Sequence, residues 1–312
     1  MTASANLSVA HRATMPDPHI TTFMQGWSLE ATLPQETEVA ALKMILPPGA
    51  PVYLSAVPTR DPVAQLHAAV RVAAAGLVPV PHLAVRHFSS AGDLDAFLAR
   101  MAEEAGVTRV LVIAGDRDPP AGAFRSALEA IDAGLLQRHG IGEIGIAGYP
   151  DGHSRIAPQE LDRALMEKVE IATQLGLCVH IVTQFCFEPE TIVGWISRLR
   201  DFGVELPVKI GLAGPTNIAA LLRYARRCGV RASAQGLARQ SGLARHMFAM
   251  SAPDGLVRVL ADAHAGGRLG QVAPHFFSFG GVTATARWAS AVAAGRFTLD
   301  AGGGFQVAPP TG

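Results

Sequence analysis

The chain has 312 residues and no net formal charge, because 26 Lys and Arg side chains balance 26 Asp and Glu side chains. Hydrophobic residues make up 49% of the chain and charged residues 17%, which supplies enough apolar surface for a large core. A neutral chain without a basic run lacks the electrostatic footprint of a protein that binds nucleic acid or an anionic membrane. The composition therefore favours a small-molecule ligand.

The termini and the cysteines indicate a protein of the cytoplasm. Residues 1–20 hold no apolar stretch of signal-peptide length and are expected to form a flexible tail, and no later stretch approaches ~20 apolar residues. The three cysteines, Cys178, Cys186 and Cys228, lack CxxC spacing, and an odd number cannot all pair. Buried thiols in a reducing compartment are favoured over a redox or metal role.

From Trp27 onward, short apolar runs alternate with longer stretches of helical spacing. The runs predict strands over residues 27–33, 51–57, 78–85, 109–116, 143–150, 179–187, 207–214 and 274–281. They are continuously apolar rather than alternating, which is typical of parallel strands covered on both faces. Amphipathic spacing predicts helices over residues 93–106, 189–203 and 216–229.

This alternation predicts an α/β fold, a single-domain (β/α)8 TIM barrel over residues 21–300 with a C-terminal tail over 301–312. A doubly wound open sheet is the competing architecture, but no GxGxxG joins the first strand to the first helix. Residues 230–253 break the regular alternation and are expected to form extra helices before the last strand. Nothing in the chain resembles an interdomain linker.

Barrel enzymes carry their catalytic groups at the C-terminal ends of the strands. Glu30 lies within an apolar strand, where a carboxylate costs several kcal/mol unless it is paired or protonated, so we expect a working acid with a raised pKa. The alternative is a strand-end residue that faces solvent. Asp116 follows Gly115 at a strand end and is either functional or a helix cap. Gln184 either binds a flat heteroaromatic ring or satisfies the backbone.

Three further candidates are weaker when taken singly. His82 alone is more often a satisfied core histidine than a ligand or base. Tyr149 and His153 share one loop and either line a planar ligand or mark an ordinary turn with Pro150 and Gly152. The histidines form neither HxH nor HExxH spacing, so no metal site is predicted, and no signature for acyl transfer is present.

Taken in order, the segments SLEATLP, PHL, AGD, AGYPDGH, VTQFCF and HFFSF resemble the methylenetetrahydrofolate reductases, which are flavin-containing (β/α)8 barrels. The resemblance runs from about Trp27 to Phe297. It is most specific in AGYPDGH followed by VTQFCF, where the family has Tyr-Pro-Glu-x-His and then Thr-Gln-Phe-Phe-Phe.

The resemblance implies a role for each matching residue. Glu30 would be the general acid that opens the five-membered ring of the methylene-folate to an iminium, and Asp116 would lie near flavin and pterin. Gln184 would recognise the pterin, and Phe277 belongs to the last-strand motif that meets the folate. The implied flavin contacts are His82, Gly115, Tyr149, His153 and Lys168.

The chain departs from the family pattern at four cofactor or substrate positions. Ala114 replaces an arginine, Val57 a threonine and Gly281 another arginine. Lys168 lies about one helical turn before the expected lysine, whose best-spaced positions are Ala172 and Thr173. Loss of these cations should weaken binding of the diphosphate of FAD.

Three functions are consistent with the sequence. The first is reduction of 5,10-methylenetetrahydrofolate to 5-methyltetrahydrofolate, with FAD passing hydride from NADH or NADPH. The second is a flavin-independent tetrahydrofolate enzyme of one-carbon metabolism, which reduces with nicotinamide directly or transfers a C1 or methyl group. The third is a non-catalytic folate-binding barrel. The sequence leaves open whether the chain forms a homo-oligomer.

Overall fold

Eight parallel strands close into a barrel in this computed structural model, which describes residues 17–57, 60–228, 230 and 250–307. Each pairs with its neighbours, and the last strand of the ring, β10, pairs with the first, β1. All eight predicted strands are confirmed, most of them a few residues shorter than expected. The barrel strands are β1 (Ser28–Ala31), β2 (Pro51–Leu54), β3 (Val78–Ala84), β4 (Arg109–Ile113), β5 (Glu143–Gly148), β6 (Cys178–Thr183), β7 (Val208–Ala213) and β10 (Val272–Phe277).

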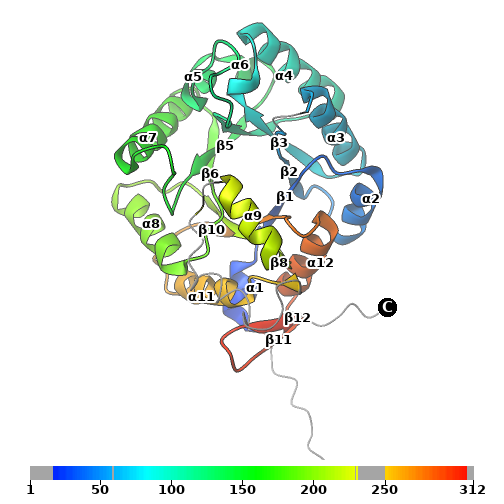
Figure 1. Cartoon of the computed structure of the whole chain (residues 1–312), viewed down its shortest axis with the longest axis vertical. Helices are drawn as coiled ribbons and strands as arrows, with labels where there is room; N and C mark the ends of the chain where they lie inside the picture. The colour runs from blue at the N-terminus through cyan, green and yellow to red at the C-terminus, as the bar shows by residue number, and fades with distance from the viewer. Residues whose placement is uncertain (1–16, 58–59, 229, 231–249, 308–312) are drawn as a thin grey trace, which may run out of the picture.

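Helices surround the barrel (Figure 1). The outer helices are α2 (Glu36–Ile45), α3 (Pro62–Ala74), α4 (Ala91–Ala105), α5 (Ala127–Asp132), α6 (Leu135–Arg138), α7 (Pro158–Gln174), α8 (Pro189–Asp201), α11 (Asp254–Ala265) and α12 (Val282–Ala293). A short helix α1 (Pro18–Phe23) precedes the first strand, and a 3-10 turn η1 (Val85–His87) follows β3. Helix α4 shows how the sequence sets these bounds: Ser90 Oγ accepts the amide of Asp93 at 3.0 Å, and Gly106 ends the helix in the left-handed conformation.

The apolar core forms two layers. The larger one lies between the barrel and its helices, and it includes outward-facing strand residues such as Ile144 and Ile146 with Trp195 and Ile196 of α8. A smaller cluster fills the barrel interior with side chains from β2, β3, β4 and β6. Its buried members are Tyr53, Val80, Leu111 and Val182.

One helix, α9 (Ile218–Cys228), leaves the outer ring and lies across the C-terminal mouth of the barrel (Figure 1). Leu221 and Ala225 of this helix pack on Phe185 and Phe187, which follow β6, and on Ala213 at the end of β7. The mouth of the barrel is therefore covered on one side by an apolar helix face.

Two small sheets lie outside the barrel. Strands β8 (Thr216–Asn217) and β9 (Met250–Ser251) pair in antiparallel fashion, and so do β11 (Phe297–Leu299) and β12 (Phe305–Val307). Phe305 is 3% exposed and stacks on Trp288, so part of the segment expected as a C-terminal tail packs on the domain. Helix α1 likewise begins inside the expected N-terminal tail, where Asp17 caps it. The extra helices expected before the last strand fall mostly on residues 231–249, outside the described residues.

Within the described ranges, none of the helices combines the length and hydropathy that a membrane span requires.

Packing of α8 on β5 generates a stability prediction. A Cβ atom at Gly148 would lie 2.6 Å from the ring of Trp195 and 2.9 Å from Ile181. We expect Gly148→Ala to lower the free energy of unfolding by about 1–3 kcal/mol, because the buried indole must move. Gly194→Ala on the same helix meets nothing within 4 Å and is the matched control, which should leave stability equal or slightly higher. Urea denaturation measures both, and equal effects of the two changes would refute the packing argument.

Candidate active site

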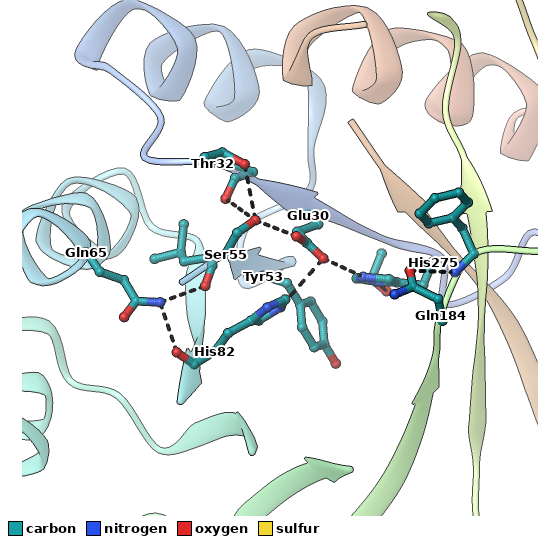
Figure 2. Close-up of polar contacts among 12 residues, drawn as sticks. Glu30, Thr32, Tyr53, Ser55, Gln65, His82, Gln184 and His275 are labelled. Carbon is teal, nitrogen blue, oxygen red and sulfur yellow. Dashed lines mark hydrogen bonds and ion pairs between the residues drawn. The ribbon is translucent and has the colours of Figure 1, made fainter. Parts of the chain in front are cut away.

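Glu30 of β1 points into the barrel near its C-terminal mouth, with its side chain 14% exposed (Figure 2). Its Oε1 accepts a hydrogen bond from the Ser55 hydroxyl, just after β2. Its Oε2 lies 3.6 Å from Nε2 of His82 on β3 and 3.8 Å from Nε2 of His275 on β10. These three facing atoms are buried without a hydrogen-bond partner, so four strands converge on one carboxyl group.

Burial is the largest single influence on this carboxyl, and it raises the pKa. The positive charge available to His82, the contact and charge of His275 and the Ser55 hydroxyl together outweigh burial and hold the pKa of Glu30 below its ordinary value. The expected raised pKa is therefore wrong for the free protein. The sequence argument counted the desolvation of Glu30 but not the partners that the barrel brings to it.

Burial has the opposite effect on the pKa values of the two histidines. Burial lowers the pKa of His82, and the charge of Glu30 only partly restores it. Burial also lowers the pKa of His275 to about 4, against the favourable contact with Glu30. At neutral pH the cluster thus consists of an ionised carboxylate between two neutral imidazoles.

His275 is fixed on all sides. Its Nδ1 lies 2.9 Å from the Ser28 hydroxyl, and these two residues are register partners on β10 and β1. The Tyr53 ring packs edge-to-face on the imidazole with centroids 4.7 Å apart. Sequence reasoning missed His275, Ser28 and Ser55, although the period of two in a strand places His275 on the same face as the predicted Phe277.

Below this cluster a polar chain leads toward the N-terminal end of the barrel. The Tyr53 hydroxyl lies 2.7 Å from His180 Nε2, and His180 Nδ1 lies 3.2 Å from Glu143 Oε1. Glu143 Oε2 lies 2.9 Å from Nε of Arg109. Contact with His180 and the charge of Arg109 lower the pKa of Glu143. Burial and the charge of Glu143 raise the pKa of Tyr53. Tyr53 therefore stays protonated, and its ring packs against His275.

Asp116 lies beyond β4 at the mouth and is 63% exposed, with Oδ1 3.3 Å from Nε2 of His87. Gly115 precedes it with φ +85°, and a Cβ there would lie 3.0 Å from Ala84 and 3.2 Å from the His87 ring. Gly115 therefore lets the chain pass close to His87. A cavity of about 40 Å³ is lined by His82 and His87 but not by Glu30 or Asp116.

Gln184 and Phe277 lie at the ends of β6 and β10. Gln184 Oε1 accepts the amide of Phe185 at 3.1 Å, which leaves its amide nitrogen available to a ligand. The Phe277 ring lies 5.5 Å from His275 and 5.3 Å from Phe185, within the aromatic cluster under α9. Tyr224 of α9 stacks on Phe279 in the same cluster.

Tyr149 and His153 form a second group. Their rings lie 5.5 Å apart, and both line a cavity of about 290 Å³ between the loop after β5 and helices α7 and α8. Burial lowers the pKa of His153 and raises that of Tyr149. Neither Glu30 nor His82 lines this cavity.

Lys168 lies on the barrel-facing side of α7, in the row that includes Leu165 and Ala172, and it does not line the cavity. Burial lowers its pKa to about 8. Ala172, one of the positions best spaced for a family lysine, is fully buried. The described part of the chain holds no cluster of three or more His, Cys, Asp or Glu that could bind a metal ion.

Comparison with known proteins places this chain in a family. The model of the methylenetetrahydrofolate reductase family matches residues 52–241, which is more than half of the chain. The chain belongs to this family. Methylenetetrahydrofolate reductase 2 of Saccharomyces cerevisiae is 27% identical over 136 residues, 40% of this chain and 22% of the yeast protein. Methylenetetrahydrofolate reductase 1 of Schizosaccharomyces pombe is 27% identical over 146 residues, 44% of this chain and 23% of that protein.

The matched region thus spans less than a quarter of the length of these two curated relatives. Among solved structures, an uncharacterized protein from Clostridium thermocellum that binds two copies of 5-methyl-5,6,7,8-tetrahydrofolic acid superposes with a TM-score of 0.55 at 10% identity. The match covers 88% of this chain and 96% of that one. At this identity the likeness shows the shared barrel fold.

The cluster predicts how stability depends on pH. The pKa of His275 falls from 6.5 to about 4 on folding, so between these values the unfolded chain binds a proton that the folded protein does not. Stability is therefore lost as the pH falls from 6.5 toward 4, and the lowered pKa of Glu30 continues the loss below 4.5.

We expect the free energy of unfolding to fall by about 2 kcal/mol per such histidine between pH 7 and pH 5, and His275→Gln to remove its share of the loss. Urea denaturation at both pH values measures it. Phe276→Leu on the same strand is the control, because an apolar core change should lower stability equally at both pH values. A His275→Gln variant with the full wild-type pH dependence would contradict the assignment.

Proposed function

We propose that the protein reduces 5,10-methylenetetrahydrofolate to 5-methyltetrahydrofolate, with NADH or NADPH as the source of hydride. The observation that carries this proposal is the buried Glu30 carboxyl at the barrel mouth, held between Ser55, His82 and His275. Membership in the methylenetetrahydrofolate reductase family supports the folate substrate. A buried acid is not needed merely to bind a folate, so its retention supports catalysis.

The acid acts on the five-membered ring of the substrate. Glu30 gives its proton to the ring nitrogen that leaves the methylene carbon, and that carbon–nitrogen bond breaks. The other ring nitrogen supplies its lone pair and forms a cationic iminium with the methylene carbon. A hydride then adds to this carbon to give the methyl group, and NAD(P)H leaves as NAD(P)⁺. The Glu30 carboxylate left behind also stabilises the iminium charge.

The ionised state of Glu30 in the free protein fits this role because binding changes the balance of influences on its pKa. Burial already raises this pKa more than any single partner lowers it. A folate seated at the mouth excludes the remaining water from the carboxyl and raises its pKa further. The substrate thereby promotes protonation of the acid that attacks it.

Three neighbouring residues would orient the pterin. The free amide nitrogen of Gln184 can donate to a pterin ring atom, and the exposed carboxylate of Asp116 can accept from ring N–H groups. The Phe277 ring offers an apolar wall beside His275. This arrangement would bring the methylene carbon close to Glu30.

FAD is the hydride carrier that the family resemblance implies, and the cavity lined by Tyr149 and His153 does not fit it. The cavity beside Tyr149 and His153 holds about 290 Å³, at the lower limit of cofactor sites of roughly 300–1,000 Å³. Among its lining residues Arg198 is the one permanent cation, against Asp151 and Asp162, whereas a diphosphate requires net positive charge. Lys168 lies outside this lining and Ala114 carries no charge. The proton transfer and the hydride transfer proposed for this protein do not require a flavin.

The poor fit of FAD favours a direct route as the second candidate. In this route the nicotinamide transfers its hydride to the folate without a flavin. The site would then hold both planar rings at the barrel mouth, and Tyr149 and His153 would line a cavity with another use. The reaction balance is unchanged, because the hydride and the proton have the same origins.

The acid role makes a direct prediction. Glu30→Gln keeps the shape of the side chain but cannot supply the proton, so kcat/KM for methylene-folate reduction should fall by roughly 10²–10⁴-fold. Glu104→Gln, on the exposed surface of α4, is the matched carboxylate-to-amide control and should retain wild-type activity. Steady-state kinetics with NADH and with NADPH measure both. A Glu30→Gln enzyme with full activity would disprove the acid role, and a wild type that binds folate without turnover would favour a binding protein.

The cofactor fit makes another prediction. We expect the freshly purified protein to show no flavin absorbance, to gain none after addition of FAD and gel filtration, and to oxidise NADH or NADPH with methylene-folate. The visible spectrum and nicotinamide absorbance measure this. A stable yellow protein with about one flavin per chain would overturn the direct route and restore FAD as the carrier.

A further inference from the structure

Ser28 and His275 form a buried polar pair directly behind Glu30. Ser28 Oγ lies 2.9 Å from His275 Nδ1, and the residues are 2% and 0% exposed. We propose that Ser28 is a positioning residue: its hydroxyl pairs with Nδ1 of His275 in either tautomer, so that the ring can follow the protonation state of Glu30 without moving. The acid function of Glu30 is taken from the proposed reaction, but the pairing is a property of the free protein.

The imidazole cannot turn away from Glu30. The rings of Tyr53 and Phe277 lie edge-on to it with centroids at 4.7 and 5.5 Å. Its Nδ1 meets Ser28, and its Nε2, buried without a hydrogen-bond partner, lies 3.8 Å from Glu30 Oε2. The one freedom left to a neutral ring is which nitrogen carries the hydrogen.

The groups around His275 keep it neutral. Burial is the largest influence against a proton on the ring; the charge of Lys209 from β7, and that of His82 from β3 whenever it is protonated, act in the same sense, and only Glu30 favours one. From β2 the protonated Tyr53 offers its ring rather than its hydroxyl, which is used by His180. A neutral His275 presents to Glu30 either an N–H donor or a lone pair, with opposite effects on the carboxyl.

The Ser28 hydroxyl can pair with His275 in both of these states. When Ser28 donates to Nδ1, the ring hydrogen is on Nε2 and stabilises the Glu30 carboxylate. When Nδ1–H donates to Ser28, the Nε2 lone pair faces Glu30 and favours the protonated acid. The ionised Glu30 of the free protein selects the first state, so Ser28 donates to Nδ1 and Nε2 carries the hydrogen.

The hydroxyl matters because it serves both states. A serine oxygen donates or accepts by rotation about one bond, so neither tautomer leaves a buried Nδ1 unpaired. The pair therefore matches Glu30 before and after it gives up its proton, with no movement of heavy atoms. An alanine at position 28 would leave Nδ1 unpaired in both tautomers, and because an unpaired buried N–H is the more costly of the two, the tautomer that the protonated acid needs would be disfavoured most.

Nuclear magnetic resonance on the free full-length protein tests the pairing without any turnover. We expect ¹⁵N shifts of His275 to show hydrogen on Nε2 and none on Nδ1 at pH 7. In Ser28→Ala the Nε2–H tautomer should persist even after Glu30 is protonated, and the Glu30 carboxyl, followed by ¹³C, should titrate about one pH unit lower, a tenfold change in proton affinity. Ser28→Thr keeps the hydroxyl and should retain the wild-type titration.

A double-variant cycle separates positioning from packing. In the His275→Gln background, Ser28→Ala should no longer shift the Glu30 titration, because the group through which Ser28 acts is gone. In turnover, the fall of kcat/KM with rising pH should move about one unit downward in Ser28→Ala and stay in place in Ser28→Thr.

Several outcomes would overturn the proposal: an Nδ1–H tautomer in the wild type, an unchanged Glu30 titration in Ser28→Ala, or a shift that persists in the His275→Gln background. The wild-type tautomer alone decides if Ser28→Ala does not fold. If the enzyme does not reduce methylene-folate but the shifts behave as expected, the proposed reaction fails and the pairing stands.

Discussion

The structure depends on one constraint: a carboxyl group is buried at the mouth of an apolar barrel and must be given partners there. Desolvation alone would make Glu30 neutral, and no single neighbour cancels it. Ser55, His82 and His275 together reverse the balance, and each comes from a different strand. The closed barrel brings these three partners together around one buried charge.

Closure of the ring is what makes this assembly possible. The first and last barrel strands, β1 and β10, become neighbours only when the sheet closes, and their register sets Ser28 opposite His275. Tyr53 then holds the imidazole from below, tied through His180 and Glu143 to Arg109. Contacts that extend from the N-terminal end of the barrel thus fix the position of His275 beside Glu30, and the C-terminal mouth remains available to a ligand.

The cavity lined by Tyr149 and His153 is separate from the Glu30 cluster. The residues implied in folate chemistry, Glu30, Asp116 and Gln184, all lie at strand ends around the mouth. Those implied in flavin binding are divided: His82 belongs to the acid cluster, Tyr149 and His153 line a separate cavity, and Lys168 is buried along α7. Of the residues that the family resemblance implies in flavin binding, Tyr149 and His153 therefore lie apart from the Glu30 cluster, whereas His82 belongs to it.

The sequence by itself determined the barrel, because continuous apolar strands and amphipathic helices are local patterns that burial on both faces requires. It also marked Glu30, Gln184 and Asp116 as strand-end polar residues. Only the tertiary structure decided the protonation state of Glu30, the role of His275 and Ser28, and the separation of Lys168 from the cavity beside Tyr149. These features depend on which strands meet and at what register, and Ser28 and His275 stand 247 positions apart in the chain. A pKa is the balance of all neighbours in space, whereas the sequence shows only the cost of burial.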